Sequence, residues 1–127
     1  MHGRAAAARS AALAALLSAL PYPTVAQADE MADAIAALGQ GTPYATAREK
    51  LIIAGLFAKI FPAETAEERC GARKDICNAY PETENCSGTG MGFCLFRFYN
   101  PAGGPTFAVT TAGEELKDLT VYGWRIE

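Results

Sequence analysis

The chain has 127 residues and a formal net charge of −3, from 11 basic and 14 acidic side chains. This length indicates one domain with a single modest core and excludes a multidomain organisation. An acidic chain without a cluster of Lys or Arg lacks the basic surface that nucleic acids and anionic lipids bind, so neither is expected as a partner.

Residues 1–28 predict a signal peptide. A positively charged start precedes an uncharged apolar stretch at residues 11–20, and the small residues Ala26 and Ala28 form a cleavage site. The apolar stretch has about half the length that a membrane-spanning helix needs, so no membrane insertion is expected after cleavage. The predicted product is a single disulfide-stabilised domain, residues 29–127, periplasmic or secreted, with a net charge of −5 because two arginines are removed.

Cleavage would also remove His2, the only histidine of the chain. Without histidine, a Ser-His-Asp or Cys-His catalytic unit cannot form, and neither can a zinc or haem site that uses a histidine ligand. We therefore expect a protein that is not an enzyme and holds no metal or cofactor, and we assign no catalytic residue.

Four cysteines, Cys70, Cys77, Cys86 and Cys94, lie close together in the sequence. In an oxidising compartment, an even number of cysteines in a small domain predicts two disulfides. A four-cysteine zinc site would favour intervals of two to four residues, whereas the intervals here are six, eight and seven residues. Three connectivities remain open. Sequential pairing is preferred because each bond closes a short loop, worth roughly 2.5 kcal/mol in the chain-entropy model.

Two helices are expected before the cysteines. The first is short and covers residues 29–38, whereas the second is clearer and covers residues 43–54, after the N-cap Thr42 and before Gly55. Apolar residues recur at helical spacing along one face of the second helix, which is expected to pack on a sheet. These residues are Tyr44, Ala47, Leu51 and Ala54.

The middle of the chain has little periodicity. Residues 56–61 form an apolar connector, and residues 62–69 predict one helical turn. Residues 70–90 are rich in Gly, Asn, Pro and Ser, which favours a disulfide-tied loop.

The last third alternates in the period of β-structure. Three strands are predicted, at residues 92–99, 106–111 and 119–126. Consecutive strands with short connections pair antiparallel. The predicted fold is therefore α+β: short N-terminal helices packed on a small three-stranded antiparallel meander, with a disulfide-tied loop between them.

Two segments resemble small exported proteobacterial proteins of unknown function. One is the helix pattern Tyr44-x-x-x-Arg48-x-x-Leu51-x-x-x-Gly55; the other is Tyr80-Pro81-Glu82 leading to Cys86-Ser87-Gly88-Thr89-Gly90 and Cys94-x-Phe96. Two features depart from the pattern: Leu56 stands where a tryptophan often follows the helix glycine, and Cys70 and Cys77 lie outside it. The resemblance implies a helix packed on a small antiparallel sheet and an exported location, and it implies no activity.

Three polar motifs invite a catalytic interpretation, and each has a simpler one. Residues 88–92 are glycine-rich like a phosphate loop but lead into a strand and lack the P-loop lysine, so a turn is expected. Glu82 and Glu84 lie in a polar loop, where carboxylates are solvated rather than held in the apolar cleft that a general acid needs. Ser87 has no histidine and no Ser-x-x-Lys base.

Two residues of the same loop are expected to anchor it. Arg48 is predicted to pair with Glu82 and so to tie the second helix to the loop. Tyr80, just before Pro81, is predicted to lay its ring on the sheet.

The candidate binding surface is one face of the predicted sheet. If the set of Phe96, Phe98, Phe107 and Trp124 faces the helix, then Phe93, Leu95 and Tyr99 face outward. Exposed apolar area of this kind often marks a protein partner. The alternative is that the connector at residues 56–61 or the disulfide-tied loop covers these side chains.

These observations favour a non-enzymatic exported binding module that contacts an envelope or secreted protein. The alternatives are a structural envelope protein without a ligand site and a small hydrolase, which the missing histidine disfavours. The oligomeric state stays open.

Overall fold

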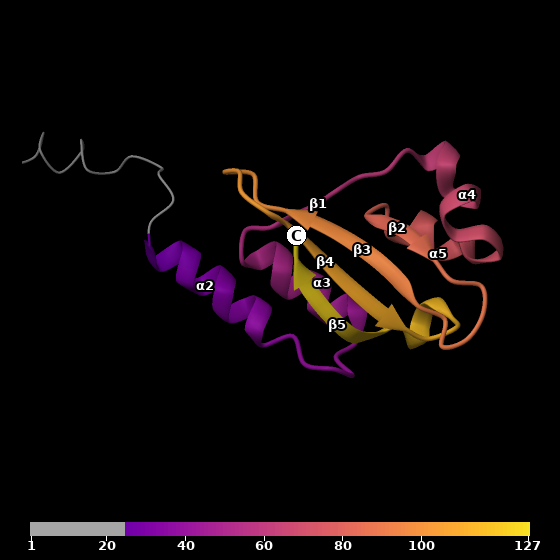
Figure 1. Cartoon of the computed structure of the whole chain (residues 1–127), viewed down its shortest axis with the longest axis horizontal. Helices are drawn as coiled ribbons and strands as arrows, with labels where there is room; N and C mark the ends of the chain where they lie inside the picture. The colour runs from indigo at the N-terminus through magenta and orange to yellow at the C-terminus, as the bar shows by residue number, and fades with distance from the viewer. Residues whose placement is uncertain (1–24) are drawn as a thin grey trace, which may run out of the picture.

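The computed structural model describes residues 25–127 and contains a five-stranded antiparallel sheet with helices on one face and a disulfide-bonded helical segment beside it (Figure 1). The strands are β1 (Phe57–Ala58), β2 (Thr83–Cys86), β3 (Cys94–Tyr99), β4 (Thr106–Ala112) and β5 (Thr120–Ile126). The α-helices are α2 (Val25–Ala36), α3 (Tyr44–Ile53), α4 (Ala66–Cys70) and α5 (Lys74–Ala79). Short 3-10 turns are found at Ala63–Thr65, Gly71–Arg73 and Leu116–Asp118. The predicted α+β class is confirmed.

Most of the predicted signal peptide, residues 1–24, lies outside the described residues. The predicted cleavage site, Ala26 to Ala28, falls in the first turn of α2. Cleavage, and with it a mature domain of residues 29–127, stays a prediction. None of the helices in the described part of the chain is both long enough and apolar enough to cross a bilayer.

The sheet is larger than the predicted three-stranded meander. Strands β3, β4 and β5 form that meander, but β1 and β2 also pair with the free side of β3, giving the order β1-β3-β4-β5 with β2 beside β1 along β3. Phe57 lies opposite Tyr99, and Cys86 lies opposite Cys94. The prediction of three strands is wrong because neither additional strand has an alternating apolar pattern: β1 has only two residues, and β2 is polar. Both segments are strands because they pair with β3.

The helices are not all N-terminal, contrary to the prediction. The segment expected to be a disulfide-tied loop contains α5 and the end of α4, which pack against β2. The bond between Cys70 and Cys77 joins the two short helices, and the buried Ile76 packs α5 into the main core. Helices of five and six residues have little intrinsic stability, and their stability therefore comes from these tertiary contacts.

The predicted helix at residues 43–54 is present as α3, but its start differs. Its N-cap is Pro43 and no side chain caps it. The N–H of Tyr44, which has no acceptor within the helix, donates instead to the carbonyl of Leu119 at 2.9 Å. The carbonyl of Thr42 accepts from the N–H of Val121 at 2.7 Å. Thr42 is the predicted cap, but in the structure its backbone carbonyl bonds to β5, next to an isolated β-bridge between Pro43 and Thr120. The predicted stop is correct, because Gly55 follows α3 with φ +105°.

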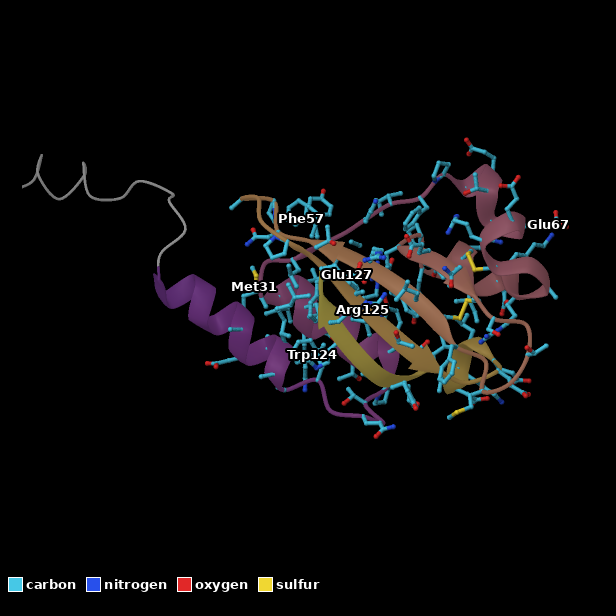
Figure 2. The ribbon with its side chains drawn as sticks, viewed as in Figure 1. Met31, Phe57, Glu67, Trp124, Arg125 and Glu127 are labelled. Atoms are coloured by element: carbon cyan, nitrogen blue, oxygen red, sulfur yellow. A yellow bond between two sulfur atoms is a disulfide. The ribbon has the colours of Figure 1, made fainter. Side chains whose placement is uncertain are left out.

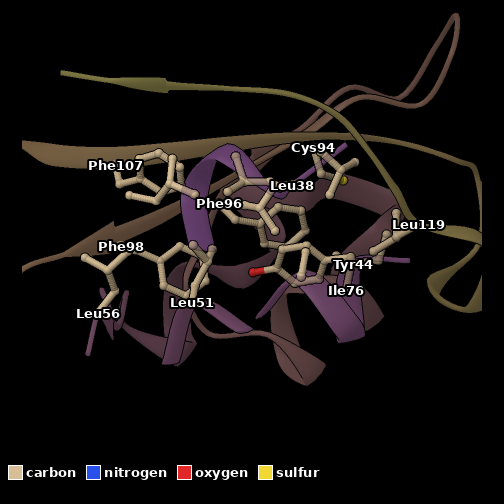
Figure 3. Packing of buried hydrophobic residues seen from close by; sticks show 14 residues of the cluster. Leu38, Tyr44, Leu51, Leu56, Ile76, Cys94, Phe96, Phe98, Phe107 and Leu119 are labelled. Carbon is tan, nitrogen blue, oxygen red and sulfur yellow. The ribbon is translucent and has the colours of Figure 1, made fainter. Parts of the chain in front are cut away.

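The core lies between α2, α3 and the inward face of the sheet (Figure 3). The ring of Tyr44 on α3 stacks on Phe96 of β3 with 3.9 Å between centroids, and Leu51, about two helical turns further along the same face of α3, is fully buried. The inward set predicted from the alternation is buried at Phe96, Phe98 and Phe107. Trp124 is paired with the inward residue Val109, yet it is 39% exposed because it lies at the border of the sheet.

Two disulfides are formed, Cys70–Cys77 and Cys86–Cys94, which is the sequential pairing preferred above. Cys86–Cys94 joins directly opposite residues of β2 and β3. Cys70 Sγ and Cys86 Sγ are 3.7 Å apart, so the two disulfides form one sulfur cluster where α4 meets the sheet.

Candidate binding site

The outer face of the sheet, turned away from α2 and α3, holds the residues that the alternation predicted to face outward. Leu95, Arg97 and Tyr99 alternate along β3 with the buried Cys94, Phe96 and Phe98. The connector does not cover this face, because its strand β1 pairs edge-on with β3. The disulfide-bonded helices do not cover it either, since they pack against β2 (Figure 1). The outer face is therefore open around Tyr99, which is 38% exposed, whereas Phe93 and Leu95 are half-buried.

The centre of the outer face is an ion-pair cluster. Arg97 donates to Glu84 at 3.2 Å and also to Glu127, and Arg125 donates to the other oxygen of Glu127. Ala108 lies between the two arginines, opposite both, and is 1% exposed.

The charges of this cluster reinforce one another. The hydrogen bond from Arg97, with a second from Arg125, lowers the pKa of the Glu127 carboxyl below its ordinary value. The same bond to Glu127 raises the pKa of Arg97. Both shifts favour the charged forms of Arg97 and Glu127 and so the ion pair between them; Figure 2 labels Glu127 and Arg125 close together on the sheet.

Aromatic pairs lie at the two ends of this cluster. Phe57 of β1 and Tyr99 of β3 are directly opposite, with 5.8 Å between ring centroids, and they are 54% and 38% exposed. At the other end Phe93 packs on Tyr122 of β5 with 4.9 Å between centroids, and Tyr122 is 45% exposed. Of the residues proposed from sequence, Tyr99 is exposed, whereas Phe93 and Leu95 are half-buried.

The residues that sequence reasoning missed are Phe57 and Tyr122. The sequence pattern places Phe57 in an apolar connector, whereas the structure places it in β1, a strand that extends the sheet. Tyr122 lies at a register shift of β5, between residues paired with Thr111 and Thr110, so a strict period of two does not predict its side. A cross-strand search for aromatic partners of Phe93 could have found it.

The carboxylate of Glu82 belongs to a buried network and not to a solvated loop. Glu82 is fully buried; it accepts from the hydroxyl of Tyr44 at 2.7 Å and from Arg48 Nε at 2.6 Å. The predicted pair of Arg48 and Glu82 is confirmed, while the prediction that Glu82 is solvated is wrong. Tyr80 also packs as predicted, edge-on to Tyr44 and Phe96.

The ionisable side chains of this network bind one another. Burial, followed by the charge of Glu82, raises the pKa of Tyr44 well above its ordinary value. The hydrogen bond to Glu82 raises the pKa of Arg48. Both Glu82 oxygens are engaged, at 2.6 and 3.4 Å from the Arg48 guanidinium, so the carboxylate acts as an anchor between α3 and the start of β2.

The glycine-rich stretch at residues 88–92 is a turn, as expected, and the carbonyls at its two ends bind the guanidinium of Arg73. Arg73 donates to the carbonyls of Ser87 at 3.2 Å and Gly92 at 3.0 Å, and also to that of Gly113. A Cβ on Gly92 would lie 2.7 Å from the Gly113 carbonyl oxygen, so glycine is needed for the two loops to converge on the guanidinium. A phosphate-binding loop presents backbone N–H donors to its ligand, whereas this loop presents carbonyl acceptors, which favour a cation.

The remaining chemical candidates are occupied by local structure. The Ser87 hydroxyl donates to the Thr89 carbonyl at 3.0 Å and accepts from the Thr89 N–H, which makes it part of a turn. Within residues 25–127 no three His, Cys, Asp or Glu side chains are grouped as metal ligands.

An apolar groove of about 320 Å³ lies on the other side of the sheet, between α2 and the border strand β5. Met31 and Ile35 line it from α2, and Trp124 and Ile126 line it from β5; Figure 2 shows Met31 and Trp124 on these two elements. Its lining carries no charged side chain, and its volume is at the lower end of the range for small-molecule pockets.

Comparisons of the chain with known protein families, with curated proteins and with solved structures find no match. The resemblance to small exported proteobacterial proteins therefore stays a prediction, and the function is argued from geometry.

Proposed function

We propose that the protein is a non-enzymatic binding module that acts outside the cytoplasm and contacts a protein partner through the outer face of its sheet. The observation that carries this proposal is the open outer face, on which Phe57–Tyr99 and Phe93–Tyr122 flank a charged centre. Exposed aromatic residues around arginines are the composition that protein interfaces favour.

An extracytoplasmic location is supported by two kinds of observation. Residues 1–28 have the layout of a signal peptide. Two disulfides, Cys70–Cys77 and Cys86–Cys94, are typical of an oxidising compartment. Mass spectrometry of the protein recovered from the envelope or medium tests this location, and a chain beginning at Asp29 is expected. An intact N-terminus on the exported protein would contradict it.

The absence of a catalytic role is supported by the roles of the polar groups. Glu82 is bound by Tyr44 and Arg48, and Ser87 closes a turn with Thr89. Each candidate group therefore has a structural role that needs no substrate.

The proposal is tested by affinity capture from an envelope extract of the producing cell with three forms of the protein. Tyr99→Glu places a charge on the outer face, whereas Ile53→Glu places one on α3, where Ile53 is 77% exposed on the opposite side of the sheet. A partner captured by the wild type and by Ile53→Glu, and reduced at least tenfold by Tyr99→Glu, is expected.

Two outcomes would contradict the proposal. Equal capture by both variants would show that the outer face is not the contact. If no protein is enriched by the wild type, the structural envelope protein without a ligand site becomes the better description.

A further inference from the structure

The second surface that can bind a partner is the free edge of the sheet along β5, separate from the outer face. Thr106 and Glu127 exchange both backbone hydrogen bonds at 2.9 Å, which fixes the pattern between β4 and β5. Because hydrogen-bonded and non-hydrogen-bonded pairs alternate, Arg125 and Gly123 also bond to β4. The backbone groups of Trp124 and Ile126 therefore point away from β4.

These outward groups have no partner among the described residues. The segment before α3 occupies only the start of the edge: Gly41 and Thr42 bond to Val121, and Pro43 lies opposite Thr120. No backbone hydrogen bond from outside the sheet reaches Trp124 or Ile126 within residues 25–127. An edge with two unpaired N–H and two unpaired C=O groups is a template for another strand.

The apolar groove lies directly beside this template. Trp124 and Ile126 are paired with the inward residues Val109 and Phe107, so their side chains lie on the same face of the sheet as α2. Both side chains line the groove together with Met31 and Ile35 of α2. Residues of an added antiparallel strand that stand opposite Trp124 and Ile126 would point to this same face, and hence into the groove.

We propose that the β5 edge and this groove bind an extended peptide segment of another protein by strand addition, with aliphatic side chains at alternate positions entering the groove. The four free backbone groups supply hydrogen bonds, and the uncharged lining of about 320 Å³ selects apolar side chains. The volume, at the lower end of the range for small-molecule pockets, is enough for aliphatic side chains of a bound strand.

A second copy of the chain fits this edge poorly. The antiparallel register that would use Trp124 and Ile126 of both copies places Arg125 opposite Arg125, and like charges directly opposite are destabilising. The register centred on Trp124 instead places Ile126 opposite Tyr122, which lies at the register shift of β5. A separate peptide carries no such restriction.

The probe is a blocked heptapeptide with Val or Ile at its second, fourth and sixth positions and Thr elsewhere. Its control has the same composition with the three aliphatic residues adjacent. Trp124 is the only tryptophan of the chain and lies at the site, so its emission reports binding directly. A saturable emission change with the alternating peptide is expected, and at least tenfold weaker binding of the control.

Variants separate backbone pairing from side-chain contact. Ile126→Pro deletes one free N–H and should weaken binding at least tenfold, whereas Ile126→Val retains it and should stay within threefold of wild type. Tyr99→Glu, on the outer face, should leave peptide affinity unchanged, so failure of this proposal is distinguishable from failure of the outer-face function.

Amide exchange measured by NMR tests the same pairing without a variant. The N–H groups of Trp124 and Ile126 should exchange rapidly in the free protein and at least tenfold more slowly with the alternating peptide. The N–H of Arg125 should already be protected. Equal binding of the two peptides, or unchanged exchange at Trp124 and Ile126, would overturn the proposal. A dimer that Ile126→Pro dissociates would assign the edge to a second copy and overturn it as well.

Discussion

The two edges of the sheet differ in how completely they are closed. On the side of β3 that faces away from β4, the backbone is paired with β1 and β2, and the Cys86–Cys94 disulfide links β2 to β3 covalently. Along β5, only the first residues have a backbone partner beyond β4 within residues 25–127, at Thr42 and Pro43. Residues at the first edge therefore hold the fold together, whereas the backbone groups of the later β5 residues remain available for hydrogen bonds to a partner.

The closed edge is held by charged side chains as well as by the disulfide. Arg69 on α4 donates to the carbonyl of Thr83 in β2 and to that of Pro62 at 3.1 Å. The carbonyl of Glu82 accepts from the N–H of Arg97 on β3, while its carboxylate binds α3. No comparable set of side-chain bonds connects β5 to anything beyond β4 and the outer-face cluster in the described part of the chain.

Leu51→Ala should have the largest effect, because the core beneath the sheet supports both edges. Leu51 is fully buried, and truncation of such a leucine costs about 4 kcal/mol through lost contacts and the remaining cavity. Urea unfolding followed by Trp124 fluorescence measures it. Glu49→Ala, on the exposed side of α3, should cost under roughly 0.5 kcal/mol. Equal stability of the two variants would show that α3 is not packed as described.

Glu82→Ala should have the next largest effect and should act on the closed edge. It leaves the Tyr44 hydroxyl and the Arg48 guanidinium without their acceptor, and breaking a buried pair costs about 3 kcal/mol when one partner keeps some contact with water. The matched control is Glu84→Ala, which breaks the half-exposed pair with Arg97 and should cost less than about 1 kcal/mol. Similar losses for both variants would mean that Glu82 has no special role in closing this edge.

The sequence predicted the meander, the main helix and the disulfide pairing better than it predicted the closed edge. Periodic segments such as β3 and α3 carry their own signal, because one face is buried along their whole length. Strand β2 reads Thr-Glu-Asn-Cys and has no such period. Its conformation depends on β3, and the burial of Glu82 depends on Arg48 and Tyr44, which are more than 30 residues away in sequence.

The candidate site could be predicted only in part, because some of its residues lie in periodic segments and others do not. The outward positions of Leu95 and Tyr99 follow from alternation along one strand. The aromatic partners Phe57 and Tyr122 could not be placed, because one depends on pairing across strands and the other on a register shift. The free backbone groups of Trp124 and Ile126 have no signature in side-chain chemistry at all, since they depend on which strand is last in the sheet.

Tyr44→Phe should have a smaller effect at neutral pH and a distinct dependence on pH. It removes a hydrogen bond to a carboxylate, which costs about 1.5 kcal/mol. Because burial and Glu82 raise the pKa of Tyr44 in the folded state, the stabilisation is fully present below the unfolded pKa near 10 and is lost as the pH rises through the folded value. The urea midpoint of the wild type should therefore fall more than that of Tyr44→Phe between about pH 9 and pH 11. Parallel curves for the two proteins would contradict this linkage.

Ile126→Pro should have the smallest effect on stability, and it tests the open edge directly. Proline lacks an N–H, and a free-edge position loses no ladder hydrogen bond when its N–H is removed. Because the backbone of Ile126 points away from β4 and its side chain is 58% exposed, the variant should cost less than about 1 kcal/mol. The control is Arg125→Pro, one residue earlier, where the missing N–H breaks a bond to β4 and should cost about 3 kcal/mol or more. Urea unfolding of the two variants measures the difference. If Ile126→Pro were as destabilising as Arg125→Pro, the N–H of Ile126 would already have a partner, and the two edges of the sheet would not differ in the way described.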